Sequence, residues 1–400
     1  MRHARRLRRH PLARGAAVVV AAVLSFGTAG VATAYVRLNN NIDKHDVTNL
    51  LGDDRPEVQP VDPEDPDAGL PLNILLMGSD VRTGENAEIG GVVEGMRSDT
   101  TIVAHISADR QRMDLVSIPR DSHVEIPACL RSDGSESAAH DARFNEAFSI
   151  GAKNDEVQDA AACTIKTVES LTGVHIDRWM VVDFSGFINM VDALGGIPIC
   201  IPNEMKSPDA GLHVQPGNQV LDGPTALAFA RARKGIGVGD GSDTNRLGRQ
   251  QQLLAATVRQ VLAQNLLTDS ASLYRFLNAA TRSLTADPAT GDIRELTGLA
   301  FSLKNIPAGN ITFMTIPFAA YPPDPNQVVW TPEADQIWAN MAADQPLVAP
   351  PDPPTPAPAP SAGATVPAAP APTVAPATPA ATPKPGVAPF TPDDVTAVCG

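Results

Sequence analysis

Cysteine is scarce in this chain, and none of it is arranged as a metal or redox motif. The 400 residues contain four cysteines, Cys129, Cys163, Cys200 and Cys399, and no two of them have the C-x-x-C spacing. This excludes the usual zinc and dithiol motifs. In an oxidising compartment a disulfide is the default, and we favour Cys129–Cys163 among the possible pairings, because both flank the loop and helix after a predicted strand pair.

Charge is almost absent from two long segments. Residues 15–36, "GAAVVVAAVLSFGTAGVATAYV", have no charged side chain. A helix of that length would extend roughly 33 Å, enough to cross a hydrocarbon core of about 30 Å. The segment 346–400 is dominated by Pro, Ala and Thr over most of its length, so it cannot bury enough apolar surface to fold. We predict a transmembrane helix at 15–36 and a disordered tail at 346–400.

Acidic residues are missing from residues 1–14, which carry six arginines. Such a basic flank stays in the cytoplasm, so everything after Arg37 is predicted to lie outside the membrane. The alternative is a cleaved secretory signal with a small-residue site at Ala32–Ala34. Both interpretations export the rest of the chain. Residues 37–70 are acidic and proline-rich, and we expect an extended extracytoplasmic stalk.

The exported part is strongly acidic. The chain has 31 basic and 45 acidic residues, so without the six leading arginines its net charge is −20. Phosphate backbones repel such a body, which excludes generic nucleic-acid binding. A phosphate ligand would have to meet a local cluster of arginines.

Residues 71–345 alternate strand and helix patterns. "LNILLMGSD", "DTTIVAHIS", "RMDLVSIPRD", "RWMVVDF" and "IPICIP" are typical of strands, and helical periodicity follows in "RFNEAFSIGA", "DEVQDAAACTIKTVESLTG" and "SGFINMVDALGG". This alternation predicts an α/β fold, a three-layer α/β/α sandwich with a central mixed sheet.

Charged residues cluster at the predicted strand ends. Asp80 ends its strand, Arg120 and Asp121 end another, and Arg97 and Asp99 precede a third. If the strand from Asp99 runs antiparallel to the one from Leu72, these side chains converge on one rim of the sheet.

A second charged group lies in "LDGPTALAFARARKGIGVGDGSDTNRLGRQQQLL". Asp222 is a candidate N-cap of a helix that ends in arginines, and the Gly-rich run 235–241 is predicted to be a flexible loop. Asp243 is a second candidate N-cap, followed on one helix by Arg246 and Gln250. Arginines suit phosphate oxygens, and carboxylates suit Mg²⁺ (or Mn²⁺), so the pattern favours a metal-bridged diphosphate site.

Six segments in order, "NILLMGSDVR", "RSDTTIVAHI", "SIPRDSHVEIP", "RFNEAF", "VVDFSGFINMVDALGGI" and "LDGPTALAFARARK…GSDTNRLGRQQ", resemble the LytR-CpsA-Psr family of cell-wall ligases. The resemblance covers roughly 72–263. It implies an enzyme, a phosphotransferase that moves a glycopolymer from a polyprenyl-pyrophosphate carrier to peptidoglycan. The alternatives are a polyprenyl-pyrophosphate hydrolase and a non-catalytic membrane-bound regulator, which the acidic charge and export argue against.

The resemblance also implies roles for single residues. It makes Asp80 and Asp99 the metal-associated carboxylates, and it assigns to the pyrophosphate Arg97, Arg120, Arg231, Arg233, Asp243, Arg246 and Gln250. Asp240 is an alternative to Asp243, and Arg82 and Arg249 are further candidates. For the base that activates the wall hydroxyl, Asp121 and Asp99 both remain open. A lipid channel is expected between sheet and helices, with Phe184, Phe187, Ile188 and Val191 as candidate lining residues.

Overall fold

The computed structural model describes residues 11–58, 69–80, 86, 89, 95–241, 243–264, 270–347, 386, 388–392 and 394. Its centre is a seven-stranded sheet in the order β1 (Asp43–Lys44), β14 (Leu284–Ala286), β7 (Arg178–Val182), β2 (Leu72–Ser79), β3 (Ser98–Ile106), β4 (Met113–Ile118) and β15 (Ile311–Thr315). The pairs β1–β14, β7–β2 and β4–β15 are parallel and the others antiparallel. The predicted mixed sheet is confirmed.

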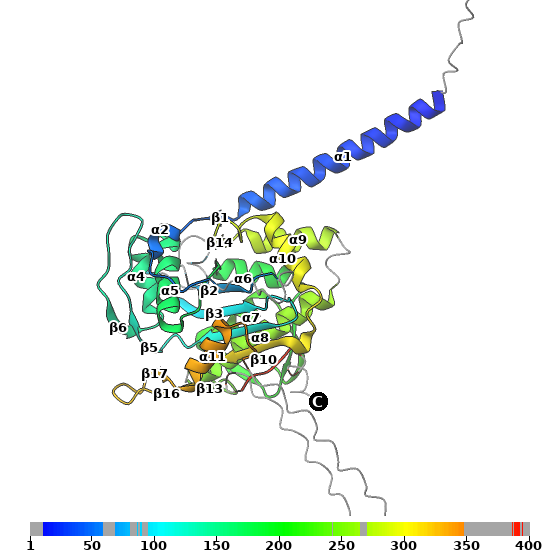
Figure 1. Cartoon of the computed structure of the whole chain (residues 1–400). Helices are drawn as coiled ribbons and strands as arrows, with labels where there is room; N and C mark the ends of the chain where they lie inside the picture. The colour runs from blue at the N-terminus through cyan, green and yellow to red at the C-terminus, as the bar shows by residue number, and fades with distance from the viewer. Residues whose placement is uncertain are drawn as a thin grey trace, which may run out of the picture.

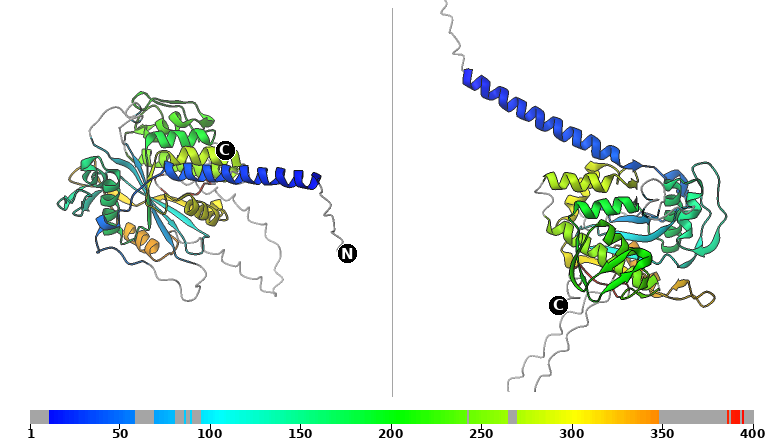
Figure 2. Two further views of the ribbon diagram at one scale, coloured as in Figure 1. Left: turned by 90° about the horizontal axis from the view of Figure 1, so that it is seen from above. Right: turned by 180° about the vertical axis from the view of Figure 1, so that it is seen from behind.

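Helices cover both faces of this sheet, as Figures 1 and 2 show. One face is covered by α2 (Thr48–Leu51), α4 (Glu146–Gly151), α5 (Val157–Thr172) and α11 (Glu333–Ala342). The other carries α6 (Phe184–Ala193), α7 (Gly223–Arg231), α8 (Asp243–Ala263), α9 (Ser270–Thr281) and α10 (Ile293–Leu303). The three-layer α/β/α prediction is therefore confirmed.

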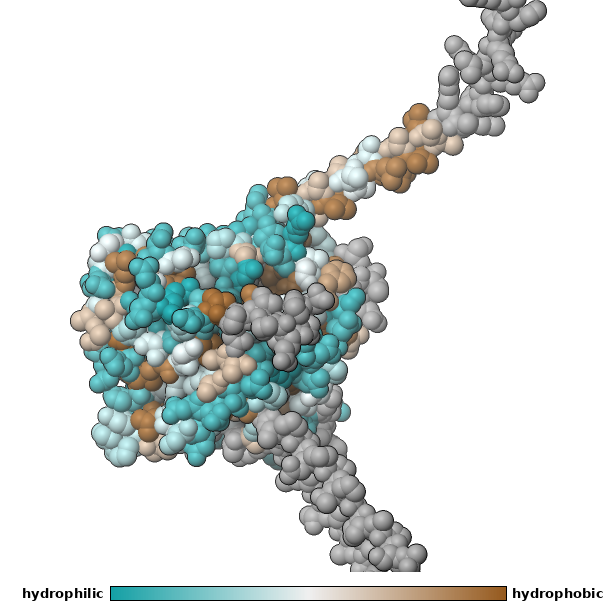
Figure 3. Space-filling model, viewed as in Figure 1, coloured by the Kyte–Doolittle hydropathy of each residue, from teal (hydrophilic) through white to brown (hydrophobic). Residues whose placement is uncertain are grey.

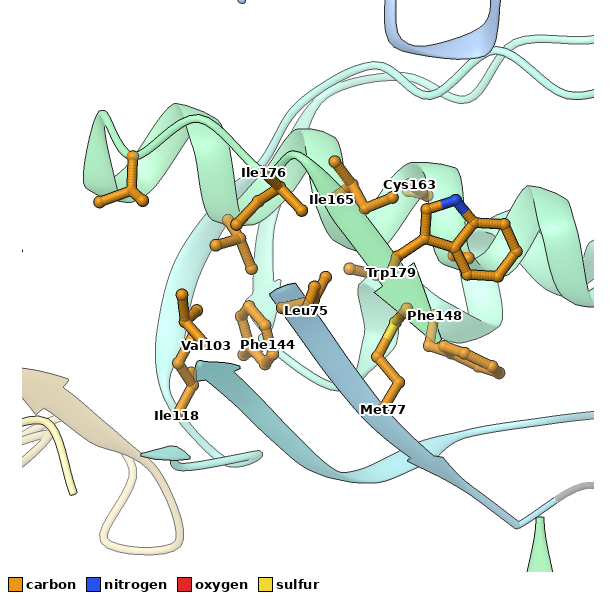
Figure 4. Close-up of a cluster of buried hydrophobic side chains, with 14 of the residues drawn as sticks. Leu75, Met77, Val103, Ile118, Phe144, Phe148, Cys163, Ile165, Ile176 and Trp179 are labelled. Carbon is orange, nitrogen blue, oxygen red and sulfur yellow. The ribbon is translucent and has the colours of Figure 1, made fainter. Parts of the chain in front are cut away.

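The two cores follow from strand periodicity, because successive side chains of a strand point to opposite faces. On β2, Leu75 and Met77 are buried on the α5 side, whereas Ile74 is buried on the α8 side. Figure 4 shows the first cluster, in which Leu75 and Met77 lie among side chains that include Phe148 and Trp179. A buried β2 places its last polar residues at the rim of the sheet.

Short elements surround the sheet. The two-stranded pairs are β5 (His123–Ile126) with β6 (His140–Arg143), β8 (Ile197–Ile201) with β11 (Gly217–Leu221), β9 (Met205–Ser207) with β10 (Leu212–Val214), β12 (Lys234–Gly235) with β13 (Gly239–Asp240), and β16 (Phe318–Ala320) with β17 (Val328–Trp330). Three 3₁₀ turns, η1 (Ala152–Asn154), η2 (Pro208–Ala210) and η3 (Ala308–Asn310), complete the described elements.

The expected disulfide is present. Cys129 and Cys163 are bonded with an S–S distance of 2.00 Å, and they join the loop after β5 to helix α5. Cys200 on β8 is also disulfide-bonded, and the described part of the chain has no free cysteine.

The N-terminal helix α1 spans Pro11–Asn41, and its segment Ala16–Asn41 is long and apolar enough to cross a membrane. Its apolar side chains are exposed along the part of α1 that projects from the domain in Figure 3. The helix extends beyond the predicted 15–36.

The predicted stalk at 37–70 is wrong over its described part. Leu38 and Ile42 are buried against β14 and α10, and β1 pairs with β14 as an edge strand of the sheet. Further along, Val47 is buried in the α5-side core, and Arg55 makes an ion pair with Glu169. Apolar residues spaced among the acidic ones give this segment enough burial to pack.

Two other expectations need correction. Within the tail predicted to be disordered, Phe390 is buried and forms backbone hydrogen bonds with Phe313 on β15. The Gly-rich run 235–241 is a short hairpin, β12–β13, rather than a flexible loop. It is held because Ile236 exchanges backbone hydrogen bonds with Lys206 and Val238 is buried.

Candidate active site

The rim where β2 ends and β3 begins fixes the first carboxylate. The two strands are antiparallel, with Ser79 opposite Ser98, so Asp80 lies beside Arg97 as expected. The Asp80 backbone N–H donates to the Arg97 carbonyl at 3.0 Å, and Asp80 Oδ1 accepts from the Arg97 N–H at 2.6 Å. Asp80 is buried, and these two backbone contacts help to fix its position at the rim.

Asp99 is the point at which three arginines meet. Arg120 Nη1 lies 2.6 Å from Asp99 Oδ1, and Arg246 Nη1 lies 3.8 Å from Asp99 Oδ2. Burial acts to raise the pKa of Asp99, but the charges of Arg120, Arg246 and Arg233 outweigh it and leave that pKa below its usual value. Residues from β3, from the end of β4, from the segment after α7 and from α8 are thereby brought together.

Arg231 is positioned by the end of helix α7. Asp222 caps α7 by accepting from the Thr225 N–H at 3.0 Å, as predicted, which fixes the helix that carries Arg231 in its last turn. The Arg231 guanidinium lies over the Phe184 ring of α6, 4.6 Å from its centroid. Arg231 is therefore held by a cation–π contact, in which the flat cation stacks on the ring.

Helix α8 contributes a buried cation and a buried amide. The Arg246 side chain is 3% exposed, although arginine seldom enters a protein interior without charged partners. One turn later, Gln250 Nε2 donates to the Ala230 carbonyl at 3.4 Å, and its buried Oε1 has no hydrogen-bond partner among the described residues. Gln250 therefore faces the end of α7, whereas Arg246 faces Asp99 on β3.

Arg249 has a different role from its neighbours. Its guanidinium donates to the backbone carbonyls of Phe229, Ala232 and Val238. These contacts tie α8 to the end of α7 and to the β12–β13 hairpin, so Arg249 supports the site rather than facing a ligand. α8 begins at Asp243 as expected, but the Asp243 side chain and Arg82 lie outside the described residues.

A polar cavity of about 160 Å³ opens beside Arg120, lined by Arg97, Arg120, Asp121, Arg143, Asn145 and Glu146. Asp121 lies between two cations, with Arg120 Nε at 3.3 Å and Arg143 Nη1 at 3.5 Å. Arg143 and Glu146 were not among the residues predicted from the sequence. Both lie in the segment "RFNEAF", whose charges are also typical of the start of a helix. The feature that could have identified them as site residues is that a basic and an acidic side chain flank the buried Phe144.

The candidate lipid-channel residues share helix α6 but not one environment. Val191 is fully buried in the α8-side core, and Phe187 packs partly buried against that core. Phe184 lies under Arg231. Val191 is therefore a packing residue, whereas Phe184 contacts a predicted site residue, Arg231.

Two carboxylates at this rim are candidate ligands for the expected Mg²⁺. Asp80 and Asp99 offer hard carboxylate oxygens from adjacent strands of one rim, the ligand type that Mg²⁺ prefers. No group of three or more metal-ligating side chains occurs within the described residues. Mg²⁺ commonly keeps waters and substrate phosphate oxygens, so two carboxylates fit a metal that is completed by a diphosphate.

The protein is an α/β/α domain with a mixed central sheet, and arginines and carboxylates gather at one rim of that sheet. A family model identifies it further. The LytR_cpsA_psr family model matches residues 33–343, and the chain belongs to this family.

Relatives agree with this assignment. The chain is 32% identical over 263 residues to "Cell wall biosynthesis protein LcpA" of Corynebacterium glutamicum, covering 61% of this chain and 49% of that protein. It is 30% identical over 227 residues to "Polyisoprenyl-teichoic acid--peptidoglycan teichoic acid transferase TagU" of Enterococcus faecalis, covering 56% and 64%. The matched part thus spans about half the length of the first of these relatives.

A solved structure shows the same fold. The LytR-Csp2A-Psr enzyme from Actinomyces oris superposes with a TM-score of 0.52 at 20% identity, covering 72% of this chain and 93% of that chain.

Proposed function

We propose that the protein transfers a glycopolymer from a polyprenyl-pyrophosphate carrier to peptidoglycan, forming a phosphodiester. The observation that carries the proposal is that Arg120, Arg233 and Arg246, from three separate parts of the chain, all interact with Asp99. A diphosphate offers a reason for so many cations at one rim of an acidic domain. The relative named as a teichoic acid transferase gives the reaction type.

In this proposal each group of residues has its own task. Arg120, Arg233 and Arg246 hold the phosphate oxygens and stabilise the charge that develops on them during transfer. Arg97, Arg231 and Gln250 surround the same anion, and the Phe184 ring fixes Arg231 toward it. Asp80 and Asp99 would hold Mg²⁺, which when bound supplies further neutralisation of the bridging phosphate oxygens.

The reaction is a displacement at the phosphorus that carries the glycan. The wall hydroxyl forms the new O–P bond, and the bond to polyprenyl phosphate breaks, so that polyprenyl phosphate leaves. The arginine cluster favours this step because its cations are already in place and need not reorganise.

The location of the domain is part of the proposal. The Cys129–Cys163 disulfide favours an oxidising compartment, and α1 offers a helix that can cross the membrane, preceded by six arginines. We infer a single-pass protein with its N-terminus in the cytoplasm and its domain outside. A reporter enzyme that works only outside the cytoplasm, fused after Leu347, should be active, and a soluble chain beginning near Tyr35 would contradict the anchor.

The transfer itself is tested with the purified full chain in detergent, incubated with lipid-linked glycan with and without peptidoglycan fragments. The expected product is a glycan–peptidoglycan phosphodiester that forms only when the fragments are present, with release of polyprenyl phosphate. Release of glycan phosphate at the same rate with and without fragments would instead identify a hydrolase.

A further inference from the structure

The hydroxyl that attacks phosphorus must lose its proton, and the cavity beside Arg120 limits which group can take it. This inference rests on the proposed transfer reaction and concerns its acceptor side. Two carboxylates line the cavity, Asp121 and Glu146, and a third, Asp99, lies at the same rim. Their surroundings differ, which allows them to be compared as bases.

Asp99 and Asp121 both make ion pairs with arginines. Asp99 has an arginine nitrogen within 4 Å of each of its oxygens, and its pKa is lowered by those arginines despite its burial. Asp121 has Arg120 on one oxygen at 3.3 Å and Arg143 on the other at 3.5 Å. Both oxygens of each carboxylate thus already lie near arginines, so neither residue is well placed to accept the proton of an incoming hydroxyl.

Glu146 differs from these two carboxylates in its surroundings. It is the first residue of α4, its side chain is half-buried, and it makes no ion pair with any basic side chain of the described chain. Its backbone is nevertheless fixed. The neighbouring Asn145 N–H donates to the Arg120 carbonyl at 3.0 Å, and Ala147 and Phe148 are fully buried immediately after it. Glu146 thus lines the cavity with a fixed backbone, and its carboxylate makes no ion pair with the described residues.

The charged groups around it set the geometry. Arg97 faces the cavity from the β2–β3 rim, Arg120 and Asp121 from the end of β4, and Arg143 from β6. In the proposed reaction these cations would hold phosphate oxygens, and Glu146 at the start of α4 is the carboxylate of the cavity that is left for a neutral hydroxyl. An incoming sugar hydroxyl would therefore meet Glu146 as it approaches phosphorus.

We propose that Glu146 is the general base of the transfer reaction. Its carboxylate takes the proton of the attacking wall hydroxyl as the oxygen forms its bond to phosphorus. The bond to polyprenyl phosphate breaks with its electron pair, and Glu146 is left as the carboxylic acid. The proton then passes to solvent through the open cavity, so atoms and charges balance without any further reagent.

The test compares Glu146→Gln, Glu146→Asp and the matched control Glu125→Gln, in which an exposed glutamate of β5 outside the cavity loses the same charge. Transfer to peptidoglycan fragments and binding of a non-hydrolysable polyprenyl-diphosphate analogue are measured across pH. We expect Glu146→Gln to lower kcat by roughly 10²- to 10⁴-fold and to remove the acidic limb of the pH–rate profile, with analogue binding unchanged. Glu146→Asp should restore part of the rate.

A second readout separates a base from a merely structural residue. An acceptor alcohol of lower pKa needs less help in losing its proton, so the Glu146→Gln defect should shrink with a fluorinated alcohol. The inference is overturned if Glu146→Gln keeps the wild-type pH profile, or if its loss is the same for every acceptor. If wild-type protein transfers nothing while the analogue binds, the proposed function fails instead.

Discussion

Phe390 and Phe313 form a two-residue β-bridge, with backbone hydrogen bonds of 3.0 and 2.8 Å and stacked rings whose centroids are 5.5 Å apart. Both rings are buried, and nearby the Gly386 N–H donates to Gln251 Oε1 at 2.9 Å. In Figure 1 this red segment lies on the side of the domain away from α1. Phe390 thus makes an isolated antiparallel bridge to β15, the last strand of the sheet.

This bridge predicts that the C-terminal segment contributes to stability. Phe390→Ala removes a fully buried ring from the α8-side core and should lower the free energy of unfolding by roughly 3 kcal/mol, the lower end for Phe→Ala in a core. Pro389→Ala, at the exposed neighbouring position, is the control and should change it by less than about 0.5 kcal/mol. Urea unfolding measures both. Equal stability of the two variants would show that the segment does not pack in solution.

The arginine cluster should act as one unit in catalysis. Arg120→Ala and Arg231→Ala should each lower turnover by roughly 10³-fold, by analogy with arginines that stabilise transferring phosphoryl groups. The double variant should be little worse than either, because residues that act together are not additive. Arg275→Ala, on the exposed surface of α9, is the control. Retention of near wild-type transfer by folded Arg120→Ala would contradict the proposed site.

Asp80 should govern metal dependence. Asp80→Asn keeps the shape of the side chain and an oxygen for the Arg97 N–H but removes a charge, so Mg²⁺ should bind more weakly in the presence of a diphosphate ligand. We expect the Mg²⁺ concentration for half-maximal activity to rise at least tenfold, and calorimetric titration should show the same direction. Unchanged metal binding would assign Asp80 to backbone anchoring alone.

The Asp344 carboxylate, which packs against the other end of β3, should make stability depend on pH. His105 is fully buried, and its Nε2 lies 2.9 Å from Asp344 Oδ1, which Arg112 also contacts at 2.7 Å. Burial acts to raise the pKa of Asp344, but the hydrogen bonds and charges of His105, Ala108 and Arg112 outweigh it and leave that pKa lowered. A lowered native pKa gives stability that is present above about pH 4 and lost as pH falls through the native pKa.

The test of this pair is Asp344→Asn, which tolerates the left-handed backbone at this position, φ 51°. Removing one partner of a buried ion pair should cost roughly 3 kcal/mol at pH 7. The difference from wild type should shrink below pH 4, where the wild-type carboxyl becomes protonated too. A difference that stays constant from pH 7 to pH 3 would exclude this origin.

Much of the central sheet could be predicted from the sequence, because its signals are local. The buried run before Asp80 and the two following strands have clear strand patterns, and antiparallel pairing then fixes which charged ends meet. Asp222 was recognisable as an N-cap for the same reason, since capping involves only neighbouring residues.

The remaining features depend on contacts between distant segments. Phe390 lies beyond a long Pro/Ala-rich stretch, and composition averaged over that stretch hides one aromatic residue whose partner is Phe313. Leu38 and Ile42 are similarly hidden among polar neighbours. Arg143 and Glu146 are site candidates because the β5–β6 hairpin and the start of α4 bring them to the cavity beside Arg120. No local sequence pattern encodes that arrangement.

The continuity of α1 with the sheet has a mechanical consequence. Helix α1 ends at Asn41, whose amide donates to Thr281 of α9 at 3.1 Å, and the chain enters β1 two residues later. Because only one residue separates α1 from β1, a membrane-embedded α1 would hold the domain at a fixed distance from the bilayer and in a fixed orientation. If the protein has the proposed transferase activity, it would then reach only acceptor strands that lie close to the bilayer, so the place where the acceptor is made would set the time of attachment.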